Sequence, residues 1–180
     1  MQTEDPFLNA ETAAIHAGGK HYAGHSHLSP IFATSTFIFD SAEQGMNRFT
    51  GKEEGFIYSR FGNPTTSGAA SMIASLEAFG LKDEKGEALP LKAILHSSGQ
   101  AALSTLLLSN LQSGDGVLSH YSLYGGTHEF IYDILPRYGI KSFMDDLKDG
   151  DRLRHILKTN PSIRLIHIET PANPTMACID

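Results

Sequence analysis

The feature that most constrains the fold of this chain is an alternation of short apolar runs and amphipathic segments over residues 92–168. The runs are of strand length and lie at 92–96, 117–119, 140–144 and 163–168. Helical patterns separate them, at 100–112, at 127–138 and around 153–157. Strands that alternate with helices in this way are typical of βαβ units, which have parallel strands and right-handed crossovers. We therefore predict an α/β fold built on a parallel sheet.

Another helix is predicted ahead of the first run, from Asn63 to Gly80. Asn63 is a suitable N-cap, and Pro64 suits the first helical position. Apolar residues then recur at helical spacing, at Ala69, Met72, Ile73 and Leu76. Segment 100–112 is apolar nearly all round, so we expect that helix to be buried.

Three polar stretches fall where predicted strands end, at Ser97–Gly99, Tyr121–Gly126 and Glu169–Asn173. Ligands of parallel α/β sheets bind at the carboxyl ends of the strands. The first stretch also opens a helix, whose unpaired N–H groups suit a phosphate, and Gly99 would allow close approach to the backbone. Taken alone, Ser97–Gly99 is a weak signal that favours a plain strand–helix connection.

Composition excludes several classes of function. The net charge of −6 gives no support for binding nucleic acid or an anionic membrane. No apolar run approaches the ~20 residues that span a bilayer. Cys178 is the one cysteine, so no intrachain disulfide forms, and we expect a cytoplasmic protein. The glycine patterns of dinucleotide and nucleoside triphosphate sites are absent.

The first 62 residues carry few regular signals. Residues 28–40 are predicted to be an extended, ordered arm, and Phe49–Gly55 a polar loop. Four histidines cluster at 16, 21, 25 and 27, but their spacing matches no standard metal site, so we expect no metal.

Four stretches together resemble the pyridoxal-phosphate-dependent enzymes of cysteine and methionine metabolism. They are Tyr58–Thr65 (YSRFGNPT), Ser97–Ala102 (SSGQAA), Leu123–Thr127 (LYGGT) and Glu169–Pro174 (ETPANP). The family includes methionine γ-lyase, cystathionine γ-synthase and O-acetylhomoserine sulfhydrylase. The resemblance implies a fold-type I architecture, with a mostly parallel sheet, helices on both faces and an N-terminal arm. It divides the chain into an arm, residues 1–62, and the first part of the cofactor-binding domain, residues 63–180.

The same resemblance assigns roles to particular residues. Ser98, Gly99 and Gln100 would hold the cofactor phosphate, although relatives often have methionine where Gln100 stands. Tyr124 would lie against the pyridine ring and serve as an acid or base for the leaving group. Glu169 and Asn173 would stand on the O3′ side of the ring. Read without the resemblance, Tyr124 is a packed loop aromatic.

Tyr58 and Arg60 would bind the cofactor phosphate of a neighbouring subunit, which implies a homo-oligomer, expected to be a tetramer. The guanidinium is planar and always charged, which suits a phosphate. The alternative for Arg60 is an exposed side chain paired with Glu53 or Glu54.

Catalysis in this family needs a lysine that forms a Schiff base with the cofactor. The eight lysines of this chain, at 20, 52, 82, 85, 92, 141, 148 and 158, occupy none of the corresponding contexts. We therefore expect the chain to be the N-terminal part of a larger enzyme and to be inactive alone. A non-catalytic relative and an unrelated phosphate-binding α/β domain are the alternatives.

The reaction implied is elimination or γ-replacement on a sulfur amino acid or an O-acylated homoserine. Methionine γ-lyases usually carry a cysteine where this chain has Gly126. That difference slightly favours a sulfhydrylase or synthase.

Overall fold

The computed structural model describes residues 9–16 and 29–179, which belong to two compact units, Met1–Leu95 and His96–Asp180. The division at residues 62 and 63 that the resemblance implies stays a prediction.

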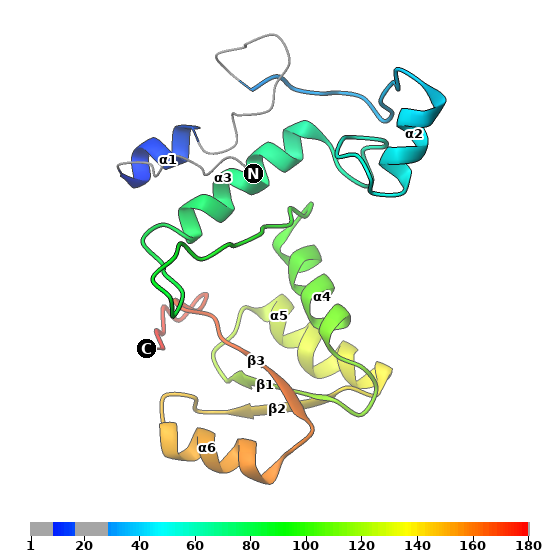
Figure 1. Ribbon diagram of the computed structural model, residues 1–180. Coiled ribbons are helices and arrows are strands. Elements are labelled where there is room, and N and C mark those ends of the chain that lie inside the picture. The colour runs from blue at the N-terminus through cyan, green and yellow to red at the C-terminus, as the bar shows by residue number, and fades with distance from the viewer. Residues whose placement is uncertain (1–8, 17–28, 180) are drawn as a thin grey trace. The chain divides into compact units, whose positions relative to one another are not determined.

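The second unit is built on a three-stranded parallel sheet of order β2-β1-β3. The strands are β1 (Gly116–His120), β2 (Lys141–Asp145) and β3 (Ile163–His167). The chain moves from β1 to β2 on one side and then passes back across β1 to β3. Right-handed crossovers in opposite directions put the connecting helices on opposite faces. Figure 1 shows this arrangement, with α6 (Gly150–Thr159) on one face and α5 (Gly125–Glu129) on the other.

The core of the second unit lies around the central strand, whose five residues are all buried. Three helical segments pack against that strand. The buried apolar cluster consists of Leu107, Leu111, Val117, Leu123, Ile131, Leu135 and Ile140. The α/β class and the parallel sheet are therefore as predicted, and each of the three strands begins and ends within two residues of its predicted range.

The predicted strand at 92–96 is wrong, because these residues form no regular element. An apolar segment becomes a strand only when a neighbouring strand accepts its hydrogen bonds. None of the strand pairings in the described part of the chain includes residues 92–96.

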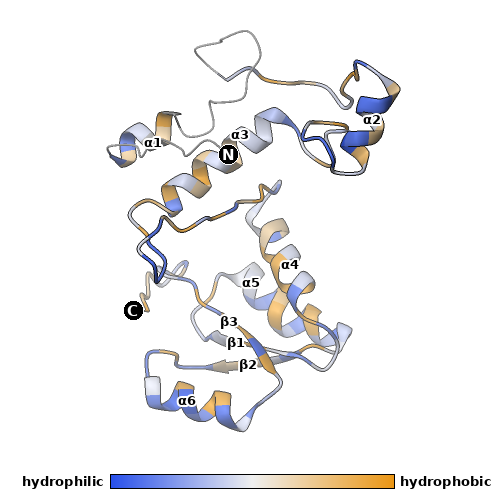
Figure 2. Cartoon of the chain, viewed as in Figure 1, coloured by the Kyte–Doolittle hydropathy of each residue, from blue (hydrophilic) through white to orange (hydrophobic). Residues whose placement is uncertain are grey.

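Two helices of the second unit also differ from expectation. Helix α4 (Gly99–Asn110) carries apolar residues along much of its length (Figure 2). Only Leu107 within it is buried, however, and Leu106 and Leu108 are about half exposed. The expectation of an all-round buried helix was wrong because burial depends on what packs against each face.

The predicted helix at 127–138 is one continuous helical segment of three kinds. It passes from α5 into a π-helical turn, η1 (Phe130–Ile134), and then into a 3₁₀ turn, η2 (Leu135–Tyr138). Pro136 lacks an N–H group and its ring crowds the preceding turn, which accounts for the change to a tighter helix. Gly139 ends the segment as predicted, with a left-handed φ of 76°.

The first unit contains α1 (Ala10–His16), α2 (Ala42–Phe49) and α3 (Pro64–Glu77), and α1 packs against α3. Asn63 caps α3 as predicted, and its side chain accepts a hydrogen bond from the Thr65 N–H group. The helix ends at Glu77, three residues before Gly80. Sequence inspection missed α2, although Ser41 and Gln44 have the spacing of a capping box.

Candidate functional site

The N-terminus of α4 is the first part of the candidate site. Ser98 is the N-cap, and its Oγ accepts a hydrogen bond from the Ala101 N–H group at 3.1 Å. The N–H groups of Gly99 and Gln100 have no acceptor within the described residues. A Cβ atom placed on Gly99 would meet nothing within 4 Å, so the space beside this backbone is open. Free donors facing open space suit an anionic group.

The start of α5 forms the second part of the site, and it lies against the Gln100 side chain. A Cβ atom on Gly126 would stand 2.8 Å from Gln100 Nε2 and 2.9 Å from Tyr124 Cε1. The structure thus brings Gln100, Tyr124 and Gly126 together, although they come from two separate helices. The Tyr124 side chain is 48% exposed, so it is not a packed loop aromatic.

The segment after β3 supplies the third part. Glu169 accepts a hydrogen bond from the Tyr124 N–H group, with 2.7 Å between nitrogen and Oε2. Asn173 lies in an exposed turn, in which the Met176 N–H group donates to the Ala172 carbonyl at 2.7 Å. A hydrogen bond of 2.5 Å between Ser122 and Thr175 ties this turn to the loop before Tyr124. The second unit therefore places Gln100, Tyr124 and Glu169 in one neighbourhood.

Tyr58 and Arg60 belong to the first unit. The Arg60 guanidinium carbon lies 5.2 Å from the centre of the Tyr58 ring and 5.3 Å from that of Phe61, which are cation–π distances. The alternative was an exposed Arg60 paired with Glu53 or Glu54. Arg60 is exposed, but the pairing is not seen, and Glu53 instead binds Arg48 at 3.2 Å. Within the described part of the chain, no carboxylate is in ion-pair distance of Arg60.

A residue that sequence reasoning did not assign to the site, Asn63, holds the Tyr58–Arg60 loop. Its Nδ2 donates to the Phe32 carbonyl at 2.9 Å and to Ser59 Oγ at 3.0 Å. Tyr58 also pairs with Thr36 in an antiparallel bridge. The sequence predicted Asn63 only as the N-cap of a helix. It did not indicate that the Asn63 Nδ2 group also binds Phe32 and Ser59.

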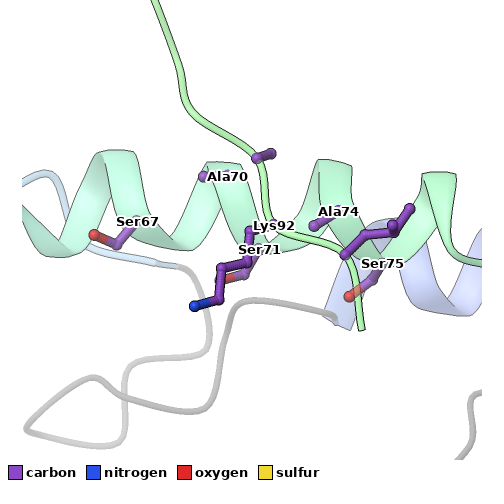
Figure 3. A pocket seen from close by; sticks show the side chains of 8 residues that line it. Ser67, Ala70, Ser71, Ala74, Ser75 and Lys92 are labelled. Carbon is purple, nitrogen blue, oxygen red and sulfur yellow. The ribbon is translucent and has the colours of Figure 1, made fainter. Parts of the chain in front are cut away.

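An open groove of about 360 Å³ runs along α3 in the first unit, and it contains none of the predicted site residues. Small side chains of the helix and the segment 91–93 line it (Figure 3). Across residues 9–16 and 29–179, no three potential metal ligands gather. His21, His25 and His27 lie outside those ranges, so the expectation about them stays a prediction.

The sequence pattern of the family described as Cys/Met metabolism PLP-dependent enzyme matches residues 11–180. Two solved structures share the fold. An O-acetylhomoserine (thiol)-lyase, as it is named, from Campylobacter jejuni aligns with 97% of this chain at a TM-score of 0.81 and 30% identity, and it carries N′-pyridoxyl-lysine-5′-monophosphate. A cystathionine γ-lyase from Lactobacillus plantarum, complexed with L-serine, aligns with 96% at a TM-score of 0.77 and 27% identity.

The fold is thus that of α/β enzymes that use pyridoxal phosphate. More particularly, the chain belongs to the family of Cys/Met metabolism PLP-dependent enzymes. It is 41% identical over 169 residues to an L-methionine γ-lyase of Fusobacterium nucleatum subsp. polymorphum, covering 94% of this chain. It is 33% identical over 175 residues to a sulfhydrylase of Fusarium oxysporum, covering 95%. The chain spans about 40% of the length of these relatives.

The described residues fit the cofactor of this family. A phosphate needs hydrogen-bond donors, and the free N–H groups of Gly99 and Gln100 supply them beside an open space that a Cβ atom on Gly99 would partly fill. The pyridine ring of the cofactor can stack on an aromatic side chain, and Tyr124 presents an exposed ring at the start of the neighbouring helix.

In the described part of the chain, no helix is long and apolar enough to cross a membrane.

Proposed function

We propose that the complete protein is an enzyme that uses pyridoxal phosphate for elimination or γ-replacement on a sulfur amino acid or an O-acylated homoserine. The observation that carries the proposal is the juxtaposition at the carboxyl edge of the sheet: unpaired N–H groups at the start of α4, with Gln100 lying against the Tyr124 turn. The names of the relatives, L-methionine γ-lyase and sulfhydrylase, support the same reaction class.

In this proposal Ser98, Gly99 and Gln100 form the cradle of the cofactor phosphate, with the backbone N–H groups of Gly99 and Gln100 as the donors. The Tyr124 ring lies on the pyridine ring, and its phenol group holds or transfers a proton at the leaving group. Asn173 donates a hydrogen bond on the O3′ side, next to Glu169. When bound, the cofactor supplies an electron sink for the carbanion that forms next to the substrate carboxylate.

The proposal extends to the assembly. Tyr58 and Arg60 contribute to the site of a neighbouring subunit in a homo-oligomer, expected to be a tetramer. Support comes from the exposed arm residues beside them, since Ile31 is 83% and Ile38 is 93% exposed in the single chain. We also propose a cytoplasmic location, because Cys178 is a free thiol of the kind that a reducing compartment preserves.

The first test is the visible absorption of the purified complete gene product, with its intact mass measured on the same sample. We expect the absorption band of lysine-bound pyridoxal phosphate and its loss on borohydride reduction. Activity would then be assayed with O-acetylhomoserine, cystathionine and methionine. A protein without the band, even after incubation with the cofactor, would contradict the proposal and favour a non-catalytic relative.

Substrate preference is tested on the same preparation. The glycine at position 126 favours a sulfhydrylase or synthase, whereas several of the more similar relatives are named L-methionine γ-lyase. Faster turnover of O-acetylhomoserine with sulfide than of methionine would support a sulfhydrylase or synthase, and the reverse order would contradict it.

A further inference from the structure

The Glu169 carboxylate lies between a backbone N–H group of the candidate site and a histidine. Its Oε2 accepts from the Tyr124 N–H group at 2.7 Å, and its Oε1 lies 3.7 Å from His167 Nε2. Both side chains are largely withdrawn from water, at 19% exposure for Glu169 and 16% for His167. The two residues are two apart at the end of β3, a spacing that points side chains to the same side of an extended chain.

His167 Nε2 is buried, and it has no hydrogen-bond partner within the described residues. The Glu169 carboxylate lies within ion-pair distance of this nitrogen, just beyond hydrogen-bond distance. A buried nitrogen without a partner is costly, and so is a carboxylate oxygen without a donor. Each of the two groups offers what the other lacks, since a ring nitrogen can donate and a carboxylate oxygen can accept.

We propose that His167 is a positioning residue, which acts through Glu169 to hold the Tyr124 backbone at the start of α5. With a proton on Nε2, the imidazole fixes one carboxylate oxygen, so the other stays directed at the Tyr124 N–H group. This inference rests on the proposed function, in which Tyr124 faces the cofactor ring. It also gives Glu169 a task besides the expected one near O3′.

Removal of the His167 ring nitrogens should release the Tyr124 backbone. His167→Phe removes the Nε2–H group that, in this inference, holds Oε1 of Glu169, so we expect the carboxylate to turn toward water and the Tyr124 amide to lose its acceptor. His167→Gln restores an N–H donor of similar reach, so it rescues the contact. Glu169→Ala removes the acceptor of the Tyr124 N–H group, so its effect on Tyr124 is the largest that loss of this hydrogen bond can produce.

The experiment is amide hydrogen exchange at Tyr124 in the complete gene product without cofactor. Loss of a hydrogen bond to a charged acceptor is expected to speed that exchange about tenfold or more in His167→Phe and Glu169→Ala. The matched control is His120→Phe. His120 is another buried histidine with an unpartnered Nε2, but its Nδ1 accepts from the Leu147 N–H group, and the carboxylate beside it is that of Asp146, at 3.7 Å, not that of Glu169. We expect that control to leave Tyr124 exchange unchanged.

A second readout is the dissociation constant for pyridoxal phosphate. We expect weaker binding in His167→Phe, with recovery in His167→Gln. If His167→Phe does not fold, Glu169→Gln tests the same pair, because a single neutral carbonyl oxygen cannot accept from both the Tyr124 N–H group and Nε2–H, and Tyr124 exchange is expected to speed up. Unchanged exchange in the folded His167→Phe variant, or equal acceleration in His120→Phe, would overturn the inference.

These outcomes separate the inference from the proposed function. If the unmodified protein does not bind pyridoxal phosphate, the proposed function fails while the exchange data still judge the His167–Glu169 pair. If it binds the cofactor and His167→Phe binds it equally well with unchanged Tyr124 exchange, the proposed function stands and the positioning role is refuted.

Discussion

At the scale of single residues, Asn63 shows how one side chain joins distant parts of the first unit. Its Oδ1 accepts from the Thr65 N–H group at 2.9 Å, which caps α3, while its Nδ2 binds the arm at Phe32 and the loop at Ser59. Only an amide offers an acceptor and two donors at this position. Asparagine is therefore required by the arm, whereas the cap alone would also accept aspartate.

Asn63→Asp is expected to keep the cap of α3 and to lose the side-chain hydrogen bonds to Phe32 and Ser59. The new carboxylate cannot donate to Phe32 or Ser59 and would face the Phe32 carbonyl oxygen. We expect the free energy of unfolding to fall by about 2–3 kcal/mol, measured by urea titration of the complete gene product. Asn110→Asp is the control, because it makes the same chemical change at an exposed position. Equal stability of the two variants would refute the arm contact.

Gly126 offers a second prediction at this scale. A Cβ atom there is too close to Gln100 and Tyr124, whereas one on Gly125 meets nothing within 4 Å. Gly126→Ala should therefore displace Gln100 or the Tyr124 ring and weaken pyridoxal phosphate binding, and Gly125→Ala should not. Adding Gln100→Ala to Gly126→Ala should recover part of the affinity, since it removes the nearest clash. Equal cofactor titrations for the two glycine variants would contradict the prediction.

At the scale of elements, the segment from α5 to η2 is fastened to the sheet by Tyr132. The Tyr132 hydroxyl donates to the Phe143 carbonyl at 2.8 Å and lies 2.6 Å from Ser119 Oγ, so it joins the π-helical turn to β1 and β2. Burial raises the pKa of the Tyr132 phenol, and the hydrogen bond with Ser119 partly offsets that rise. The folded state thus keeps the phenol protonated where the unfolded chain begins to ionise.

Tyr132→Phe should change both stability and its alkaline pH dependence. Loss of two hydrogen bonds is expected to cost about 1–3 kcal/mol at neutral pH, measured by urea unfolding. Because the folded pKa is raised, the native protein loses stability as pH rises above the unfolded value of about 10, and the variant should lack this part of the loss. Tyr138→Phe is the control at an exposed position. An unchanged alkaline slope in Tyr132→Phe would contradict the assignment.

At the scale of the whole molecule, the arm of the first unit exposes apolar side chains that a single chain leaves uncovered. Ile31, Ile38 and Phe61 are 83%, 93% and 71% exposed, and they flank the loop that carries Tyr58 and Arg60. Uncovered apolar residues of this kind mark interaction surfaces. A second subunit is the occupant that the proposed function requires.

Ile38→Glu should therefore reduce the oligomeric mass of the complete gene product, because a buried carboxylate without a partner would oppose association. Light scattering coupled to size-exclusion chromatography measures the mass. Tyr138→Glu, at an exposed site of the second unit, should leave it unchanged. An oligomer that withstands Ile38→Glu would place the subunit contact elsewhere.

Local chemistry made much of this protein predictable from its sequence. Asn63 and Gly139 cap their helices as expected, because a cap depends on a few neighbouring residues. The strands at β1, β2 and β3 were predicted for the same reason, since short apolar runs between helices have few other solutions. Four motifs in order predicted the family, which the comparisons confirm.

The tertiary structure alone decided which groups meet. No local signal indicates that the Tyr124 N–H group binds Glu169, that Gln100 lies against Gly126, or that His167 is left with a buried unpartnered nitrogen. The same holds for residues 92–96 and for the exposed face of α4, because strand pairing and burial are properties of the neighbours. The sequence by itself determined the family and most elements of the second unit. Contacts between residues far apart in the chain decided the geometry of the site, since hydrogen bonds and desolvation act through space.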